Sequence, residues 1–85
     1  MTDVASRIIR FIEDEILFRR AGVKLTRRTP LDSGTMDSLG MASLVTFLEE
    51  EFELSVDVRD IVPGNFRTVG DIERLVRSKL ATGAR

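Results

Sequence analysis

Residues 38–52 read SLGMASLVTFLEEEF and contain the clearest helical signal in the chain. Leu44, Val45, Leu48 and Phe52 recur at the spacing that places side chains on one face of an α-helix. Leu39 lies at the entry to this stripe. We therefore predict an amphipathic helix over these residues, with its apolar face turned to a core.

Four glutamates, at positions 49, 50, 51 and 53, crowd the C-terminal end of this helix. Negative charge is unfavourable there because the helix dipole ends in partial negative charge, at a cost of about 0.3–1 kcal/mol. Acids in this place suggest selection for something other than stability. The alternative is that glutamate is simply a good helix former.

Upstream, residues 2–20 repeat apolar side chains every three or four positions, which predicts a first helix with Thr2 as its cap and Gly22 as its stop. Residues 21–36 contain Pro30 and an Asp-Ser-Gly cluster, and they predict a long loop. The apolar anchors that we expect in this loop are Val23, Leu25 and Leu31.

Downstream, Pro63 and Gly64 interrupt residues 54–67, which predict one or two short helical turns with Phe66 as an anchor into the core. A last helix is expected over 68–80, where Thr68 and Asp71 have the spacing of a capping box. Residues 81–85 form a tail. The predicted fold is all-α, a small four-helix bundle of three longer helices and one short helix, with a long loop after the first, in one domain over 1–85.

Composition narrows the chemistry. The 85 residues include no His, Cys, Trp or Tyr, so the commonest general base and zinc ligand are missing and no disulfide can form. No apolar run approaches the roughly 20 residues of a membrane helix, and we expect a soluble, cytoplasmic protein. Residues 37–60 hold seven acids and one base, whereas both flanks are basic overall. This acidic middle favours a basic protein partner and argues against nucleic acid.

Residues 31–39 read LDSGTMDSL, the following helix ends in LEEEF at 48–52, and residues 65–69 read NFRTV before the last helix. These motifs, in this order, resemble the acyl and peptidyl carrier protein family, whose hallmark is Asp-Ser-Leu at the head of the second helix. The resemblance covers nearly the whole chain and is weakest in the N-terminal helix.

The resemblance implies that Ser38 is the attachment site of phosphopantetheine, which a magnesium-dependent phosphopantetheinyl transferase takes from coenzyme A. The thiol of the arm would then carry acyl or aminoacyl groups as thioesters. Asp37 would cap the helix or help to hold magnesium during transfer. Leu39 flanks the serine on its other side. No metal is expected to reside on the carrier. A helix start also suits a phosphodiester. The alternative is that Asp37 or Ser38 is only an N-cap.

The resemblance further implies a contact surface for the transferase, for a loading enzyme and for downstream synthase or tailoring enzymes. The expected contact residues are Leu39, Ala42, Thr46, Glu49, Glu50 and Arg59. Gly40 and Ser43 stand where fatty-acid carriers have acids, and Arg59 adds a positive charge to the acidic region. These departures favour a carrier of specialised metabolism, of polyketide, nonribosomal peptide or related type.

The main alternative is an unmodified helical interaction module that binds a basic partner through its acidic helix. A small enzyme or calcium-binding domain is a third hypothesis, but Asp32, Asp37 and Asp57 lack the spacing of a calcium loop. The initial Met1 favours a free-standing protein. We expect a monomer, since no heptad seam or long exposed apolar stripe is present. Apolar side chains near Ser38 could shelter an acyl chain or could belong to the core: Met41, Val45, Val58, Ile61 and Val62.

Overall fold

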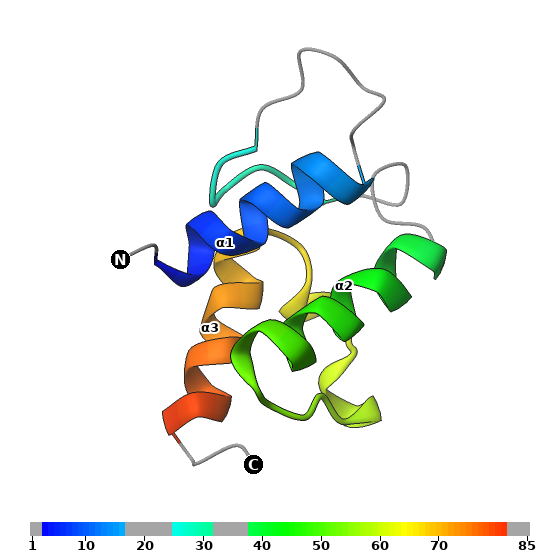
Figure 1. The fold of residues 1–85 in the computed structure, drawn as a ribbon, viewed down its shortest axis with the longest axis vertical. Helices are drawn as coiled ribbons and strands as arrows, with labels where there is room; N and C mark the ends of the chain where they lie inside the picture. The colour runs from blue at the N-terminus through cyan, green and yellow to red at the C-terminus, as the bar shows by residue number, and fades with distance from the viewer. Residues whose placement is uncertain (1–2, 17–24, 32–37, 82–85) are drawn as a thin grey trace.

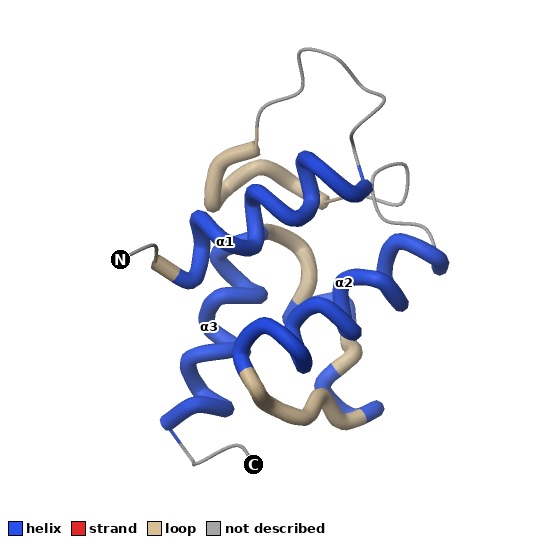
Figure 2. Tube along the Cα trace, in the orientation of Figure 1, coloured by secondary structure: helices blue, strands red, loops and turns tan. Residues whose placement is uncertain are grey.

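The computed structural model describes residues 3–16, 25–31 and 38–81. Over these ranges the chain forms helices and loops without a strand (Figures 1 and 2). The α-helices are α1 (Val4–Phe11), α2 (Ser38–Phe52) and α3 (Val69–Ala81). In the described part of the chain, no helix has the length and apolarity needed to cross a membrane. The predicted all-α class is confirmed, and the predicted short helix is a pair of 3-10 turns, Val58–Asp60 and Pro63–Asn65.

The cap of the first helix lies one residue later than predicted. Asp3 is the N-cap, because its carboxylate accepts a hydrogen bond from the Ser6 N–H at 2.7 Å, so the prediction of Thr2 as the cap is wrong. α1 then continues into a π-helical turn, Ile12–Ile16. The remainder of the predicted helix, residues 17–20, and Val23 of the following loop lie outside the described residues.

The core consists of the apolar faces of the three helices, and α1 packs against both α3 and α2 (Figure 1). Leu44 and Leu48 of the predicted α2 stripe have no exposed surface, and Phe52 at its end is 8% exposed. Complete burial of one such side chain stabilises the fold by about 1.5–3 kcal/mol. The side chains that meet these residues from the other segments are also buried: Ile8, Ile12, Leu54, Phe66, Val69, Ile72 and Val76.

The segment 25–31 is hydrogen-bonded to the start of α3. The Gly70 N–H donates to the Arg27 carbonyl oxygen at 2.9 Å, and the Leu31 N–H donates to the Arg67 carbonyl oxygen at 2.7 Å. A Cβ atom at position 70 would lie 3.2 Å from the Arg27 oxygen, so glycine permits this close approach. Leu25 and Leu31 are buried, which confirms them as anchors of the loop.

α2 ends in a Schellman motif. Glu53 adopts the left-handed conformation with φ 52°, and the Leu54 N–H donates to the Glu49 carbonyl oxygen at 3.2 Å. The Glu49 carboxylate also accepts a hydrogen bond from the Val56 N–H at 2.9 Å. Glu49 therefore fixes the path of the chain after α2, which is a structural reason for an acid that the helix dipole disfavours.

The predicted cap of the last helix is present. The Asp71 N–H donates to the Thr68 hydroxyl oxygen at 3.2 Å, as an N-cap requires. The Asp71 carboxylate lies 3.2 Å from the Arg74 guanidinium and 3.6 Å from that of Arg67. Phe66, just before this cap, is 5% exposed and is the core anchor that the sequence predicts.

The packing of α2 makes a direct prediction about stability. Leu48→Ala should lower the free energy of unfolding by about 2–5 kcal/mol, because it leaves a cavity in a completely buried site. Leu39→Ala, at a position that is 76% exposed, should change it by about 0.5 kcal/mol or less. Urea denaturation followed by circular dichroism measures both values, and equal losses for the two variants would contradict the assignment of the inner and outer faces of α2.

Candidate functional site

The proposed attachment residue, Ser38, is the first residue of α2. The backbone N–H groups in the first turn of a helix have no partner within the helix, and the dipole places partial positive charge there. Both properties suit a phosphodiester, so the position fits a phosphopantetheine arm. Asp37 lies outside the described residues.

Leu39 follows Ser38 and exposes 76% of its surface. This exposure favours the predicted role of Leu39 as a contact residue over ordinary packing in the core. Ala42, Thr46 and Glu50 are also exposed on α2, whereas Glu49 is half-buried. The predicted contact residues of α2 thus share an outer face, and Glu49 contributes to it while also bonding the Val56 N–H.

The predicted contact residue Arg59 belongs to the 3-10 turn Val58–Asp60, which a capping box stabilises. The Arg59 N–H donates to the Asp57 carboxylate at 3.1 Å, and the Asp57 N–H donates to the Asp60 carboxylate at 2.8 Å. The Arg59 guanidinium lies 3.3 Å from the Asp57 carboxylate, and the Asp60 carboxylate pairs with Lys79 of α3. Arg59 is therefore exposed on a turn that is fixed to α3.

The interpretation of Val58, Ile61 and Val62 as core residues is wrong. Their exposed fractions are 83%, 42% and 44%. A single 3-10 turn is too short to bury a complete apolar face, so these side chains remain at the surface. Met41 and Val45 are half-buried on α2. Because three of the five side chains are exposed, a shelter for an acyl chain beside them would be open to water.

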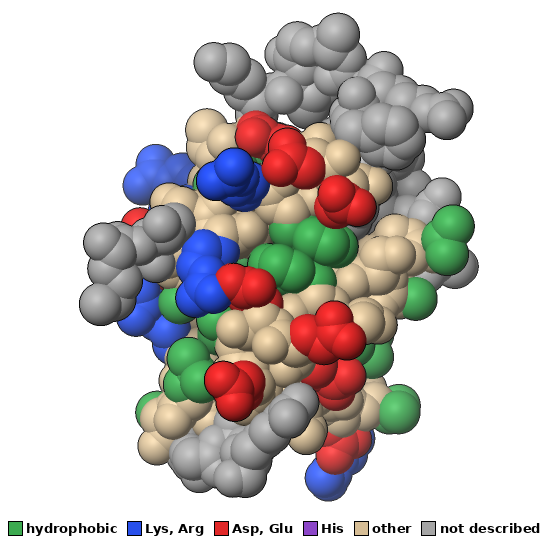
Figure 3. Space-filling model, viewed as in Figure 1, with side chains coloured by type: hydrophobic (Ala, Val, Ile, Leu, Met, Phe, Trp, Pro, Cys, Tyr) green, Lys and Arg blue, Asp and Glu red, His purple; other side chains and the backbone are tan. Residues whose placement is uncertain are grey.

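An aromatic groove between α1 and α2 is absent from the sequence-based prediction. Phe11 of α1 and Phe47 of α2 are half-buried and stacked, with ring centroids 4.2 Å apart and an interplanar angle of 15°. Figure 3 shows an apolar area in the middle of this face with carboxylates on both sides. The lining of the groove consists of Phe11, Glu15, Ala42, Ser43, Thr46, Phe47 and Glu50. The sequence feature that could have indicated the groove is Phe47, an aromatic residue directly before the buried Leu48.

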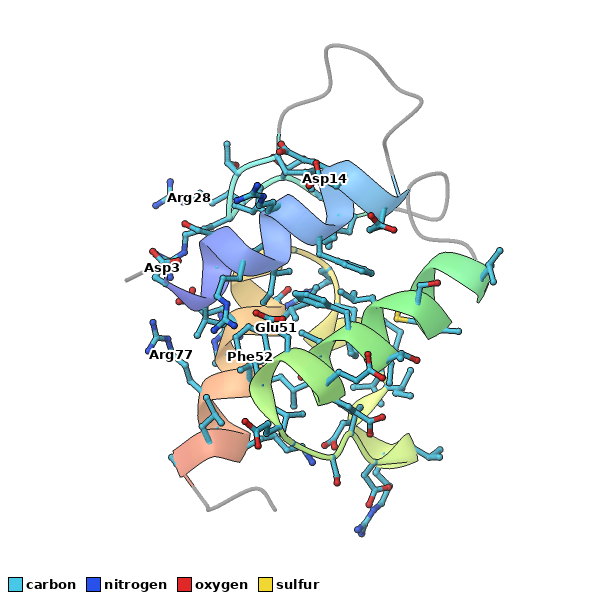
Figure 4. The ribbon with its side chains drawn as sticks, viewed as in Figure 1. Asp3, Asp14, Arg28, Glu51, Phe52 and Arg77 are labelled. Carbon is cyan, nitrogen blue, oxygen red and sulfur yellow. The ribbon has the colours of Figure 1, made fainter. Side chains whose placement is uncertain are left out.

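The groove continues into a second hollow, which shares Glu15 and the two rings with it and is further lined by Arg7, Arg10, Asp14 and Glu51. Arg7 pairs with Glu51, and its guanidinium carbon lies 4.8 Å from the centre of the Phe52 ring, whose place on α2 Figure 4 labels. Arg10 lies 3.8 Å from Asp14. In the described part of the chain, Glu15 and Glu50 have no such cation, and both carboxylates lie on the rim of the groove.

The sequence is similar to that of two aminoacyl carrier proteins. No model of a protein family matches the chain. Aminoacyl carrier protein 1 of Bradyrhizobium diazoefficiens is 29% identical over 79 residues, 93% of this chain and 88% of that protein. Aminoacyl carrier protein 2 of the same organism is 37% identical over 49 residues, 58% of this chain and 55% of that protein.

Two solved structures match the fold. The first contains Bradyrhizobium japonicum glycine:[carrier protein] ligase with its cognate carrier protein and an analogue of glycyl adenylate; the TM-score is 0.73 and the identity 28%, over 89% of this chain and 99% of the matched chain. The second contains the same ligase with glycylated carrier protein; the TM-score is 0.64 and the identity 27%, over 86% and 99%.

The fold of the described residues is that of the carrier proteins in these two complexes. Within that class the chain is a homologue of the aminoacyl carrier proteins.

The turn that presents Arg59 should contribute to the acid sensitivity of the fold. Hydrogen bonds from Lys79 and from the Asp57 N–H lower the pKa of Asp60 below its ordinary value of 3.8. The ionised carboxylate therefore stabilises the folded state above pH 3.8, and this contribution is lost as the pH falls through the lower pKa of the folded state.

Asp60→Asn should lower the urea midpoint at neutral pH and flatten its dependence on pH below 3.8. Urea titrations of both proteins at neutral and acidic pH measure this. The matched control is Glu53→Gln, since Glu53 is exposed and has no ion pair within the described residues. An unchanged acid dependence in Asp60→Asn would contradict the role of the pair with Lys79.

Proposed function

We propose that this protein carries an aminoacyl group as a thioester on a phosphopantetheine arm attached to Ser38, and that it passes this group between enzymes. The observation that supports the proposal most is the position of Ser38 at the start of a 15-residue helix, next to the exposed Leu39, in a homologue of aminoacyl carrier proteins. The relatives favour an aminoacyl cargo over the polyketide or peptidyl alternatives.

The attachment step requires little from the carrier except a presented hydroxyl. The Ser38 oxygen attacks the phosphorus that bears pantetheine in coenzyme A, a new phosphorus–oxygen bond forms, the pyrophosphate bond breaks, and adenosine 3′,5′-bisphosphate leaves. The hydroxyl proton passes to a base of the transferase, since this chain has no histidine. The free N–H groups at the start of α2 then stabilise the phosphodiester. Asp37, next to Ser38, would help to hold the magnesium of the transferase.

The arm supplies the terminal thiol on which an aminoacyl group is held. We propose that an amino acid:[carrier protein] ligase provides this group as an aminoacyl adenylate, by analogy with the matched complex that holds an analogue of glycyl adenylate. The carbonyl–sulfur bond forms, the bond from the carbonyl carbon to the phosphate oxygen breaks, and AMP leaves. The carrier presents the arm and aligns with the ligase through its outer surface.

The outer face of α2 and the turn at Arg59 form the proposed docking surface. Leu39 supplies an apolar contact, and Glu50 supplies charge that steers a basic partner during encounter. Exposed charge of this kind raises association rates more than it holds the complex together, which suits a protein that must leave each enzyme. A monomeric state, a cytoplasmic location and a role in specialised metabolism stay predictions.

Intact mass tests the attachment site. Incubation with coenzyme A, magnesium and a broad-specificity phosphopantetheinyl transferase should add one phosphopantetheine to the wild-type chain and nothing to Ser38→Ala. The matched control is Ser43→Ala, a serine five residues further along α2, and this variant should be modified as fully as wild type. If the folded wild-type chain gains no mass with either of two transferases, the unmodified helical interaction module becomes the better account.

Loading kinetics test the docking surface. With a glycine-activating ligase, Leu39→Ala should lower kcat/KM for loading of the modified carrier by about tenfold, the effect of losing roughly 1.4 kcal/mol of apolar contact. Leu80→Ala is the control, since it removes an exposed apolar side chain from α3, outside the proposed docking surface. An unaltered kcat/KM in Leu39→Ala would remove this residue from the docking surface while leaving the attachment site in place.

A further inference from the structure

We infer that the groove between α1 and α2 is a binding site for the protein's own cargo, the cationic ammonium of an aminoacyl group at the end of the arm. This inference rests on the proposed function, because it requires an arm on Ser38 and an aminoacyl thioester. It assigns a role to Phe11, Phe47, Glu15 and Glu50, which neither the attachment nor the docking surface fully uses.

The chemistry of the groove selects for a small cation. Its floor is the stacked pair Phe11 and Phe47, and its rim carries Glu15 and Glu50, which are exposed and without an ion pair in the described part of the chain. Aromatic faces attract cations through their quadrupole, and carboxylates attract them through charge. The free α-amino group of an aminoacyl thioester is cationic near neutral pH, whereas an acyl group has no charge.

The neighbouring hollow is less suited to the same ligand. Its basic side chains are Arg7, which pairs with Glu51 and covers Phe52, and Arg10, which lies near Asp14. These guanidinium groups lie against Glu51 and Asp14 and would repel a further cation, and Glu15 is the carboxylate that this hollow shares with the groove. Binding is therefore expected at the Glu15 and Glu50 end.

The attachment residue lies within reach of that end. Ser38 and Thr46 belong to the same helix and are eight residues apart, which corresponds to about 12 Å along the axis. A fully extended phosphopantetheine arm exceeds this distance, so its end can lie over Ala42 and Thr46 on the groove rim. Figure 3 shows that the groove opens on the same face along which α2 runs in Figure 1. A tether of this length maintains a millimolar local concentration, so a weak site is populated.

Nuclear magnetic resonance of the modified protein, without any enzyme, tests the inference. The transferase attaches arms that end in a stable glycyl amide or in a neutral acetyl amide, and intact mass confirms complete loading before each spectrum is recorded. The glycyl form should shift the backbone amide signals of Ala42, Thr46 and Phe47 more than the acetyl form. The excess should be about two- to fivefold, the factor that corresponds to an exposed ion pair. Added salt should reduce it.

The variant Glu15→Gln/Glu50→Gln should abolish the difference between the two arms, whereas Glu53→Gln, an exposed acid outside the groove, should preserve it. Shifts confined to residues 39–41 and equal for both arms would overturn the inference. Shifts in the groove that appear only on addition of a ligase would also overturn it, since a basic side chain of the enzyme would then be the occupant. Failure of the mass gain is a separate outcome, which counts against the proposed function itself.

Discussion

The burial of one stripe of α2 is the constraint on which the other features of the molecule depend. Leu44 and Leu48 have no exposed surface, and Phe52 is nearly buried beside them. Because a helix has fixed angles between its residues, burial of this stripe determines which side chains face solvent. Leu39, Thr46 and Glu50 then lie on the outer face, and all three are exposed. The outer face of α2, which the proposed docking surface uses, is thus a consequence of core packing.

The charges of this small domain divide into structural and uncompensated groups. Glu73 is 4% exposed, yet it accepts bonds from Arg27 of the loop and from Arg77 one turn along α3. A buried carboxylate is tolerated only when paired in this way, and the pair joins the loop to the last helix. Glu49 and Glu51 similarly stabilise the chain after α2 and its contact with α1. The acids that remain without partners in the described part of the chain are therefore those available to ligands and enzymes.

Local sequence patterns predicted the helices well. The features that they did not predict depend on contacts between segments that are distant in the sequence. The α2 stripe, the Thr68 cap and the Phe66 anchor depend on spacing within a few residues, and all three are present. Thr2 and Asp3 are both good caps, so only the path of the chain could choose between them. The exposure of Ile61 depends on the shortness of the turns around it, and the groove depends on the meeting of Phe47 with Phe11 from a distant segment. No single-helix pattern contains that contact.

A carrier must hold its cargo firmly by a covalent bond and loosely by every other interaction. An aminoacyl group differs from an acyl chain because its ammonium is strongly hydrated. Enclosure in the core would therefore cost more free energy of desolvation than the new contacts would supply. An open groove with aromatic faces and two exposed carboxylates meets both requirements, since the cation remains in water while charge and the rings attract it. The second requirement also fits exposed acids on α2 such as Glu50, because exposed charge raises association rates more than it holds a complex together.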